Sequence, residues 1–367
     1  MAVSNRSNRS NRSNRSNRSN RSDYADDELA GLRQDASLLL SEALQSAMLA
    51  FNGPLAAINA DRLSRPSEAD LYRRLNARHR SHLIVSGLMD GVVVAGMGVV
   101  TDRQARLTVG PDTLLNLMLN TEAPSLGFWQ TQINQLRTQQ WNRDDRLAEI
   151  DLQQSDLYSF LGLAVPVAAD THPWLLVLLD AVQEVAFRVA TDMKDIFRMP
   201  RPNALVDYLS PPIRTPSHSA FPSGHATEAF AAAAVLGALY PKSFMLLRQM
   251  ACRIALNRGY AGVHFPVDHH AGAVLGDLLG NHIVQRVFGT SLLRNAGSLP
   301  YNLAAPFAPP PPPPLLPTLG VSVEDFTLQS HILTNLVARP VPSAAPVSGI
   351  LPWLAGMVLG DVGTDSP

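Results

Sequence analysis

The stretch FPSGHATEAFAAAAVLGAL occupies residues 221–239 and joins a short polar motif to an alanine-rich run. Alanine and leucine favour helices, so a helix is predicted over residues 226–239. Ser223 stands where an N-cap residue would, immediately before it. The backbone N–H groups of Gly224 and His225 would then point out of the helix N-terminus, where free donors and the helix dipole favour an anion. An oxyanion site is therefore predicted at this helix start.

Two basic clusters flank this stretch in the sequence. Upstream, KDIFRMPRP at residues 194–202 contains Lys194 and Arg201, and downstream NRGYAGVHFPVD at residues 257–268 contains Arg258. Such cations hold phosphate or vanadate through charge-assisted hydrogen bonds. A solvent-exposed helix face is the ordinary alternative, but lysine is rare here, with only two in the chain. The three cations are therefore candidate anion ligands.

His264 is followed four residues later by Asp268, and Pro266 suits the first turn of a helix that begins between them. Asp268 could therefore accept a hydrogen bond from the Nδ1 of His264 and leave the Nε2 lone pair directed at the anion. Taken alone, His225 and His264 are more often structural histidines than catalytic ones. The joint order of the three clusters favours chemistry.

The remaining sequence predicts an all-α helical bundle. Apolar residues at helical spacing predict helices in seven segments, namely 27–51, 68–88, 111–119, 127–147, 173–197, 226–239 and 266–288. Strand-like alternation is scarce, and residues 92–101 are the main ambiguous stretch.

Composition divides the chain into four parts. Residues 1–22 contain six Asn-Arg-Ser repeats and are predicted to be a disordered tail. Residues 23–305 form the helical body, and the proline-rich segment 306–317 is a semi-rigid linker, an SH3-type ligand role being the weaker alternative. Residues 318–367 form a C-terminal tail that either packs on the body or makes an oligomer contact.

Charge and cysteine content exclude several classes of protein. The formal net charge is −1, which argues against a nucleic-acid coat, and the single Cys252 excludes an intrachain disulfide or a multi-cysteine metal site. Charges or prolines interrupt the long apolar runs, so no membrane span is predicted. No secretory signal peptide is recognised at the N-terminus. A soluble and cytoplasmic protein is therefore expected.

The three clusters follow the pattern Lys-x6-Arg-Pro, Pro-Ser-Gly-His and Arg-x5-His-x3-Asp. In this order they resemble the signature of the type-2 phosphatidic acid phosphatase (PAP2) and vanadium haloperoxidase superfamily, over roughly residues 175–290. The resemblance implies an all-helical fold. Asn257 departs from the pattern, which usually has serine before the arginine, but that position is not a direct oxyanion contact in the superfamily.

As a vanadium haloperoxidase, the chain would use vanadate as cofactor, with His264 as the axial ligand of the metal. His225 would act as acid and base, and Lys194 would polarise the bound peroxide. Hydrogen peroxide would oxidise a halide to hypohalous acid, which halogenates a small organic acceptor. The resemblance implies that the vanadate oxygens are bound by Lys194, Arg201, Ser223, Gly224 and Arg258.

As a phosphatase, the chain would need no cofactor. The resemblance implies that His264 attacks a phosphomonoester to form a phosphohistidine, with Asp268 activating it and His225 protonating the leaving oxygen. A non-catalytic anion-binding protein on the same scaffold is a third alternative, with a full pocket and no turnover.

Three features favour the haloperoxidase, of the bromide type. Membrane spans and a signal peptide are not recognised, and the long helical part 23–193 resembles that of the larger haloperoxidases. His218 lies five residues before Ser223, where bromide- and iodide-using members resemble it and chloroperoxidases carry an aromatic residue. A loop histidine without a role is the alternative for His218. Haloperoxidases that resemble this chain imply a homo-oligomer.

Overall fold

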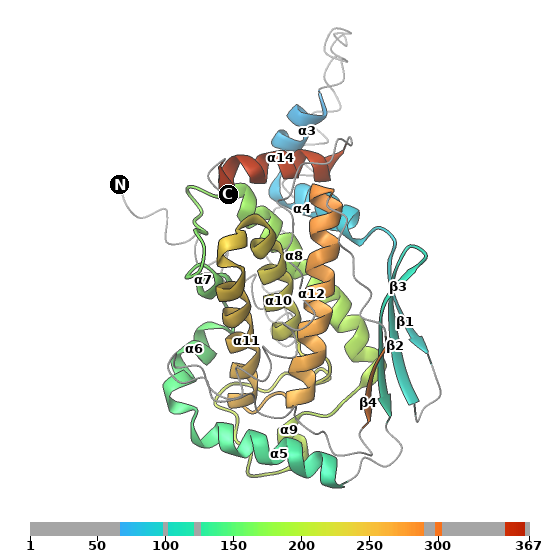
Figure 1. The fold of residues 1–367 in the computed structure, drawn as a ribbon, viewed down its shortest axis with the longest axis vertical. Coiled ribbons are helices and arrows are strands. Elements are labelled where there is room, and N and C mark those ends of the chain that lie inside the picture. Colours follow the sequence, from blue (N-terminus) through green and yellow to red (C-terminus); the bar gives the residue numbers. More distant parts are fainter. Residues whose placement is uncertain (1–66, 98–101, 121–125, 290–297, 303–348, 364–367) are drawn as a thin grey trace, which may run out of the picture.

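A computed structural model describes residues 67–97, 102–120, 126–289, 298–302 and 349–363. Most of these residues are helical, and the predicted helical bundle is confirmed. Beside the bundle stands a small sheet, whose first strand lies in the ambiguous stretch 92–101 and whose other strands were not predicted (Figure 1). The predicted helix 27–51, the Asn-Arg-Ser repeats and the proline-rich linker lie outside the described residues.

Helix α10 (Gly224–Leu239) is the centre of the bundle, and every one of its residues is buried. A helix without a polar face has to be surrounded on all sides. It is enclosed by α8 (Pro173–Phe197), α11 (Phe244–Tyr260) and α12 (Pro266–Phe288) (Figure 1). The predicted bounds of α8 and α12 are confirmed, whereas α11 was not among the predicted helices.

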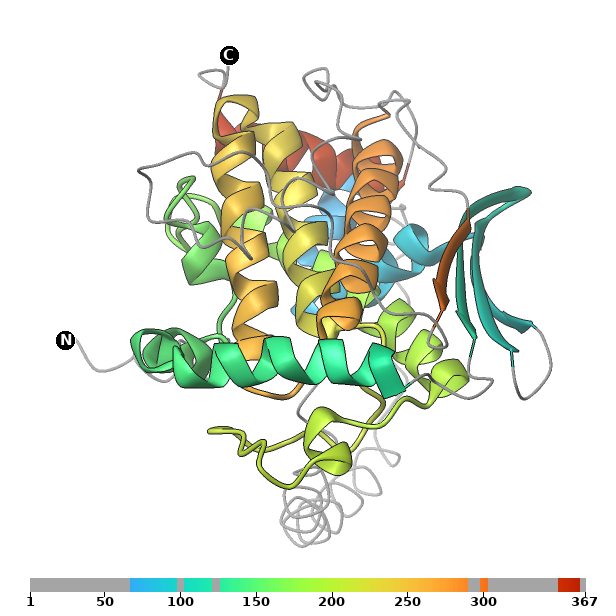
Figure 2. The same cartoon turned by 60° about the horizontal axis from the view of Figure 1, so that its bottom comes forward.

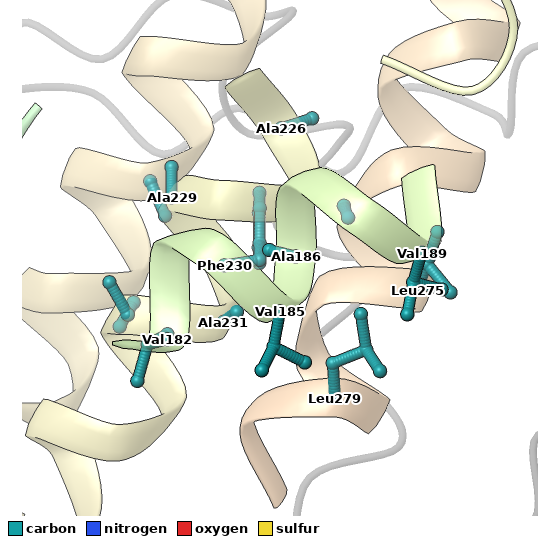
Figure 3. Packing of buried hydrophobic residues seen from close by; sticks show 14 of the residues in the cluster. Val182, Val185, Ala186, Val189, Ala226, Ala229, Phe230, Ala231, Leu275 and Leu279 are labelled. Carbon is teal, nitrogen blue, oxygen red and sulfur yellow. The ribbon is translucent and has the colours of Figure 1, made fainter. Parts of the chain in front are cut away.

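The core between α8, α10 and α12 is built from aliphatic side chains around one aromatic ring. Phe230 of α10 lies among side chains of the two neighbouring helices, including Val185 of α8 and Leu279 of α12 (Figure 3). All three are 0% exposed. Burial of such side chains contributes about 1.5–3 kcal/mol each, so this layer is a main source of the stability of the bundle.

Helices α10 and α12 approach each other closely because α12 carries Gly272, Gly276 and Gly280 on the face that meets α10. A Cβ at Gly272 would lie 2.5 Å from the carbonyl oxygen of Ser223, and one at Gly276 would lie 2.3 Å from that of Thr227. Both distances are far below van der Waals contact, and the obstructing atoms are backbone. The spacing of the two helices therefore depends on these glycines.

Gly276→Ala is expected to lower the free energy of unfolding by about 1–3 kcal/mol, because the new methyl group forces α10 and α12 apart. Gly360→Ala in α14 is the matched control, since a Cβ there meets no atom within 4 Å. That change should be neutral or stabilising by up to about 1 kcal/mol, as alanine favours helices more than glycine does. Denaturant unfolding of both variants measures the difference. Equal effects of the two would contradict the close approach.

The sheet contains the strands β1 (Val92–Met97), β2 (Asp102–Val109), β3 (Asp112–Asn120) and β4 (Ser298–Asn302). They stand in that order, with β1–β2–β3 antiparallel and β4 parallel to β3. The sheet lies beside the bundle, where β1 and β2 pack against α8 (Figure 2).

The predicted helix over residues 111–119 is wrong, because this stretch is strand β3. Gly110 adopts a positive φ of 56° in a tight turn that pairs β2 with β3. The buried side chains of Leu115 and Leu117 and the partly exposed Asn116 between them follow the period of a strand. Turn chemistry and pairing with β2 therefore outweigh the helical propensity of the leucines.

Two other predicted helices are broken in the structure. The segment 68–88 divides into α3 (Glu68–Arg74) and α4 (Ala77–Met89), because the side chain of Asn76 accepts from the backbone of His79 and starts a new helix. The segment 127–147 becomes α5 and two short helices. The bounds of the remaining elements are α5 Leu126–Trp141, η3 Asp144–Arg146, α6 Leu147–Leu152, α7 Tyr158–Leu161, α9 Pro202–Leu205 and η4 Pro241–Ser243.

Helix α14 (Ile350–Val362) packs across one end of the bundle against α8 and α4 (Figure 1). The Asp361 carboxylate accepts from the backbone N–H groups of Trp174 (2.6 Å) and Leu175 (3.0 Å). His172, the N-cap residue of α8, makes no side-chain capping bond. Asp361 therefore supplies the cap of α8 from a distant part of the chain. None of the helices in the described ranges is long and apolar enough to cross a membrane.

Candidate functional site

The candidate site lies at the end of the bundle where α10 begins, α11 ends and α12 begins. Helix α5 crosses this end (Figure 2). A pocket of about 280 Å³, open solvent included, is found there. Its lining consists of Arg201, Ile213, Pro216, His218, Gly224, His225, Arg258, Val263 and His264. Six of the nine predicted site residues line the pocket, and the other three, Lys194, Ser223 and Asp268, lie directly behind it.

Ser223 caps α10, as predicted from the sequence. Its Oγ accepts from the backbone N–H of Ala226 at 3.4 Å, and its own N–H donates to the carbonyl of Asp268 at 3.0 Å. The second bond fastens the start of α10 to the start of α12. Gly224, the first helical residue, lines the pocket and has no side chain to fill it. The positive end of the α10 dipole therefore faces the pocket.

Arg201 spans the pocket wall and contacts two histidines. Its Nε donates to the carbonyl of His218 at 3.1 Å and its Nη1 to that of Val263 at 2.7 Å. The Nη1 also lies 3.0 Å from Nε2 of His264, and the Nη2 lies 3.1 Å from Nδ1 of His218. A guanidinium has no acceptor, so both histidine nitrogens must be the accepting ones.

His264 and Asp268 make the predicted contact. Nδ1 of His264 lies 3.1 Å from Oδ2 of Asp268, an atom that also accepts from the Phe265 N–H at 2.9 Å. Because Nε2 accepts from Arg201, Nδ1 carries the proton and donates to Asp268. The Nε2 lone pair therefore faces the pocket. Burial, followed by the nearby Arg201 and Lys194, holds the pKa of His264 well below its usual value, so the ring is neutral.

Arg258 is 1% exposed, and only one nitrogen of its guanidinium is bonded. Nη2 donates to the Ile150 carbonyl at 3.0 Å and to Oε1 of Gln153 at 3.1 Å. Nε and Nη1 have no hydrogen-bond partner among the described residues. Unpaired buried donors are costly, and an oxyanion in the pocket is the natural acceptor for them.

Lys194 is buried behind the pocket and holds the loop that leads into α10. Its Nζ donates to the carbonyls of Ser219 (2.9 Å), Ala220 (3.3 Å) and Pro222 (2.5 Å). These bonds take up its three donors. The structure thus places Lys194 behind the pocket, with its donors bonded to the backbone and its charge close to the pocket.

Uncompensated positive charge dominates the electrostatics of the pocket. Burial lowers the pKa of Arg201 to about 10 and that of Arg258 to about 9, and it holds the pKa of Lys194 well below the usual lysine value. Burial also raises the pKa of Asp268 to about 7. A bound anion would offset the desolvation of the cations, so the pocket is built for negative charge.

His225 and His218 face the pocket from different elements. His225, the second residue of α10, is 5% exposed, and burial and then Arg258 hold its pKa well below the usual histidine value. His218 lies in the loop before α10 and is bonded to Arg201 through Nδ1. It therefore lines the pocket beside Arg201.

Sequence reasoning missed the layer of residues behind Arg258. Gln153, Asn257 and Glu149 form a hydrogen-bonded network there, which joins α6 to α11. Asn257 was treated only as a departure from a motif. No local pattern marks Gln153, because its partners lie more than 100 residues away in the chain.

Residues 174–290 match the family model described as the PAP2 superfamily. This region holds α8, α10, α11, α12 and every lining residue of the pocket. The region is a PAP2 superfamily domain, as the three sequence clusters predict. Members of this superfamily are enzymes, among them phosphatases and haloperoxidases.

A curated relative is the decaprenylphosphoryl-5-phosphoribose phosphatase of Mycobacterium tuberculosis, found in two strains. It is 33% identical over 126 residues, which are 34% of this chain and 66% of the relative. The chain thus matches just under two thirds of the length of that phosphatase.

Two solved structures are similar at low sequence identity. One is a transmembrane PAP2-type phosphatidylglycerolphosphate phosphatase from Bacillus subtilis, with a TM-score of 0.32 and 18% identity, over 41% of this chain and 82% of that chain. The other is a bacterial vanadium-dependent iodoperoxidase, with a TM-score of 0.36 and 15% identity, over 68% of this chain and 66% of that chain.

Proposed function

We propose that this protein is a phosphatase that hydrolyses phosphomonoesters through a phosphohistidine at His264. The observation that carries the proposal is the direction of the His264 ring, whose Nδ1 donates to Asp268 while Nε2 presents its lone pair to a pocket lined by Arg201 and Arg258. The 33% identical relative is a phosphatase, which supports the phosphatase over the haloperoxidase that the sequence alone favoured.

The phosphoryl group would lie between the unpaired donors of Arg258 and the start of α10. Nε and Nη1 of Arg258 are the donors for its oxygens, together with the N-terminal amides of α10. Arg201 has to release Nε2 of His264 when the ester binds, and its Nη1 then turns to a phosphoryl oxygen. Binding of the anion and exposure of the nucleophile would thus be one event.

The reaction would proceed in two displacements. Nε2 of His264 attacks phosphorus while the ester P–O bond breaks, and protonated His225 gives its proton to the leaving oxygen. Asp268 stabilises the positive charge that develops on the His264 ring, as a carboxylate does in other histidine pairs. Water then attacks the phosphohistidine, neutral His225 takes the proton of the water, and phosphate leaves.

A vanadium-dependent haloperoxidase is the second candidate, because His218 lines the pocket and contacts Arg201. Vanadate has the shape of phosphate and fits the same donors: Arg201, Arg258 and the start of α10 would hold its oxygens, and Nε2 of His264 would bind the metal. When bound, vanadate would activate hydrogen peroxide for the oxidation of a halide. The residues described here thus suit either oxyanion.

Hydrolysis of an aryl phosphate in the presence of a chelator is expected, because the site needs no metal for that reaction. Orthovanadate should inhibit it competitively, since both anions require the same donors. Bromide oxidation is measured in parallel, with vanadate, peroxide and a dimedone-type acceptor. Halogenation without any phosphate hydrolysis would overturn the phosphatase proposal in favour of the haloperoxidase. A protein that binds phosphate and catalyses neither reaction would instead be the non-catalytic alternative.

A further inference from the structure

Gln153 follows α6 and is completely buried behind the candidate site, with 0% exposure. Its Oε1 accepts two hydrogen bonds, from Nη2 of Arg258 at 3.1 Å and from Nδ2 of Asn257 at 3.0 Å. Its backbone carbonyl accepts a hydrogen bond from the ring of His225. One residue outside the three sequence clusters therefore contacts both the anion-binding cation and the proposed acid.

The orientation of the Gln153 amide is fixed by its neighbours. The Nδ2 of Asn257 donates to Gln153 and also to Oε2 of Glu149 at 2.9 Å, while its Oδ1 accepts from Nη1 of Arg146 at 3.0 Å. Glu149 is itself held by two bonds from Arg253, at 2.7 and 2.8 Å. Because Asn257 can point only one way, Gln153 has to turn its oxygen toward Asn257 and Arg258.

The bond from Gln153 determines which nitrogens of Arg258 are left for a ligand. Nη2 donates to both Gln153 and the Ile150 carbonyl, so its two hydrogens are taken. Nε and Nη1 remain without partners. The fork geometry of a guanidinium is rigid, so holding one nitrogen aims the other two.

The neutrality of Gln153 is as important as its position. A carboxylate at this place could accept the same two hydrogen bonds, but it would also offset the charge of Arg258. Two opposite charges within hydrogen-bond distance attract each other strongly where little water surrounds them. An amide holds the guanidinium and leaves its full charge for the anion.

We propose that Gln153 is a positioning residue for the oxyanion site, which aims Nε and Nη1 of Arg258 at the ligand and anchors the ring of His225. This rests on the proposed function only in that the ligand is a phosphoryl group or its analogue. Asn257 and Glu149 form the support that holds Gln153 in place. Asn257, which precedes Arg258 in the sequence, would thus influence anion binding through Gln153.

Two variants of Gln153 separate its effect on the orientation of Arg258 from the effect of its neutral charge. Gln153→Met keeps the size of the side chain and removes the acceptor, so the dissociation constant of inorganic phosphate is expected to rise about tenfold or more as Arg258 loses its aim. Gln153→Glu keeps the acceptor and adds a charge, so the fold should be retained while phosphate binding weakens by at least about tenfold. Gln154→Glu adds the same charge one residue further along, where the side chain is not buried, and serves as the control.

Phosphate binding by calorimetry, thermal unfolding, and the pH profile of aryl phosphate hydrolysis are measured on all four proteins. The proposal is supported if both Gln153 variants bind phosphate more weakly than the wild type. Gln153→Glu should also unfold at a temperature like that of the wild type, and Gln154→Glu should bind phosphate as the wild type does. Wild-type phosphate affinity and pH profile in folded Gln153→Glu would overturn the proposal. Wild-type protein that binds phosphate without hydrolysis overturns the proposed function alone, whereas wild-type protein that binds no phosphate overturns both.

Discussion

Replacing His264 with alanine is expected to reduce phosphate ester hydrolysis by about 10⁴-fold or more, because the substitution removes the nucleophile and not one of several binding contacts. Nε2 of His264 is the ring nitrogen that faces the pocket. A water molecule in its place would be a weaker nucleophile toward phosphorus. The measurement is kcat/KM for an aryl phosphate, together with acid-quenched trapping of the phosphohistidine from a labelled substrate.

His282→Ala is the matched control for this experiment. His282 lies on α12, the helix that follows His264, and is equally buried, but its Nε2 is bonded to the Leu88 carbonyl on α4, away from the pocket. Its loss should lower the stability of the fold and leave the phosphohistidine detectable. Labelled phosphoenzyme in His264→Ala, or its absence in wild-type protein during turnover, would refute the role of His264.

Replacing His225 with alanine is expected to have an effect that depends on the leaving group. Alkyl phosphates need a proton on the departing oxygen, so kcat/KM should fall by about 10²–10⁴-fold, the range typical of general acid catalysis. Aryl phosphates with an acidic phenol leave without help, so the first displacement should suffer far less. A plot of rate against leaving-group pKa should therefore be steeper for the variant than for the wild type.

The pH dependence gives an independent readout of the same residue. Burial and then Arg258 hold the pKa of His225 low, so its acidic form is lost as the pH rises. For an alkyl phosphate, kcat/KM of the wild type should fall with increasing pH, and this limb should be absent in His225→Ala. A bound phosphate offsets the three nearby cations and raises the pKa of His225, so the limb in kcat should lie at higher pH than the limb in kcat/KM. Equal leaving-group slopes in both proteins would exclude His225 as the acid.

The central helices could be predicted from the sequence because their signals are local. Pro173 and Pro266 suit the first turn of α8 and α12, and the alanine-rich run can only be a buried helix. Helix α11 was missed because it has arginines at 248, 253 and 258, which obscure its apolar face. Arg248 is in fact buried and paired with Asp277 of α12 at 2.6 Å, a contact that no local pattern reveals.

Most of the polar lining of the pocket could be predicted from the sequence, but the arrangement of its side chains could not. The order of motifs placed Arg201, His225, Arg258 and His264 together, and the structure brings them to one pocket. Lys194 donates to three loop carbonyls, and this arrangement depends on the path of residues 219–222. Such loop geometry is decided by tertiary packing, as are the partners of Gln153.

The glycines of α12 limit how this site can open. Gly272 lies against the backbone of Ser223, so α10 and α12 are in direct backbone contact at this end. The two helices must therefore move as one body. Room for a bulky ester is therefore expected from Ile213 and Pro216, the lining residues that come from the loop before α10. Changes in substrate size should be sought in that loop, whereas larger residues at the α12 glycines would destabilise the bundle.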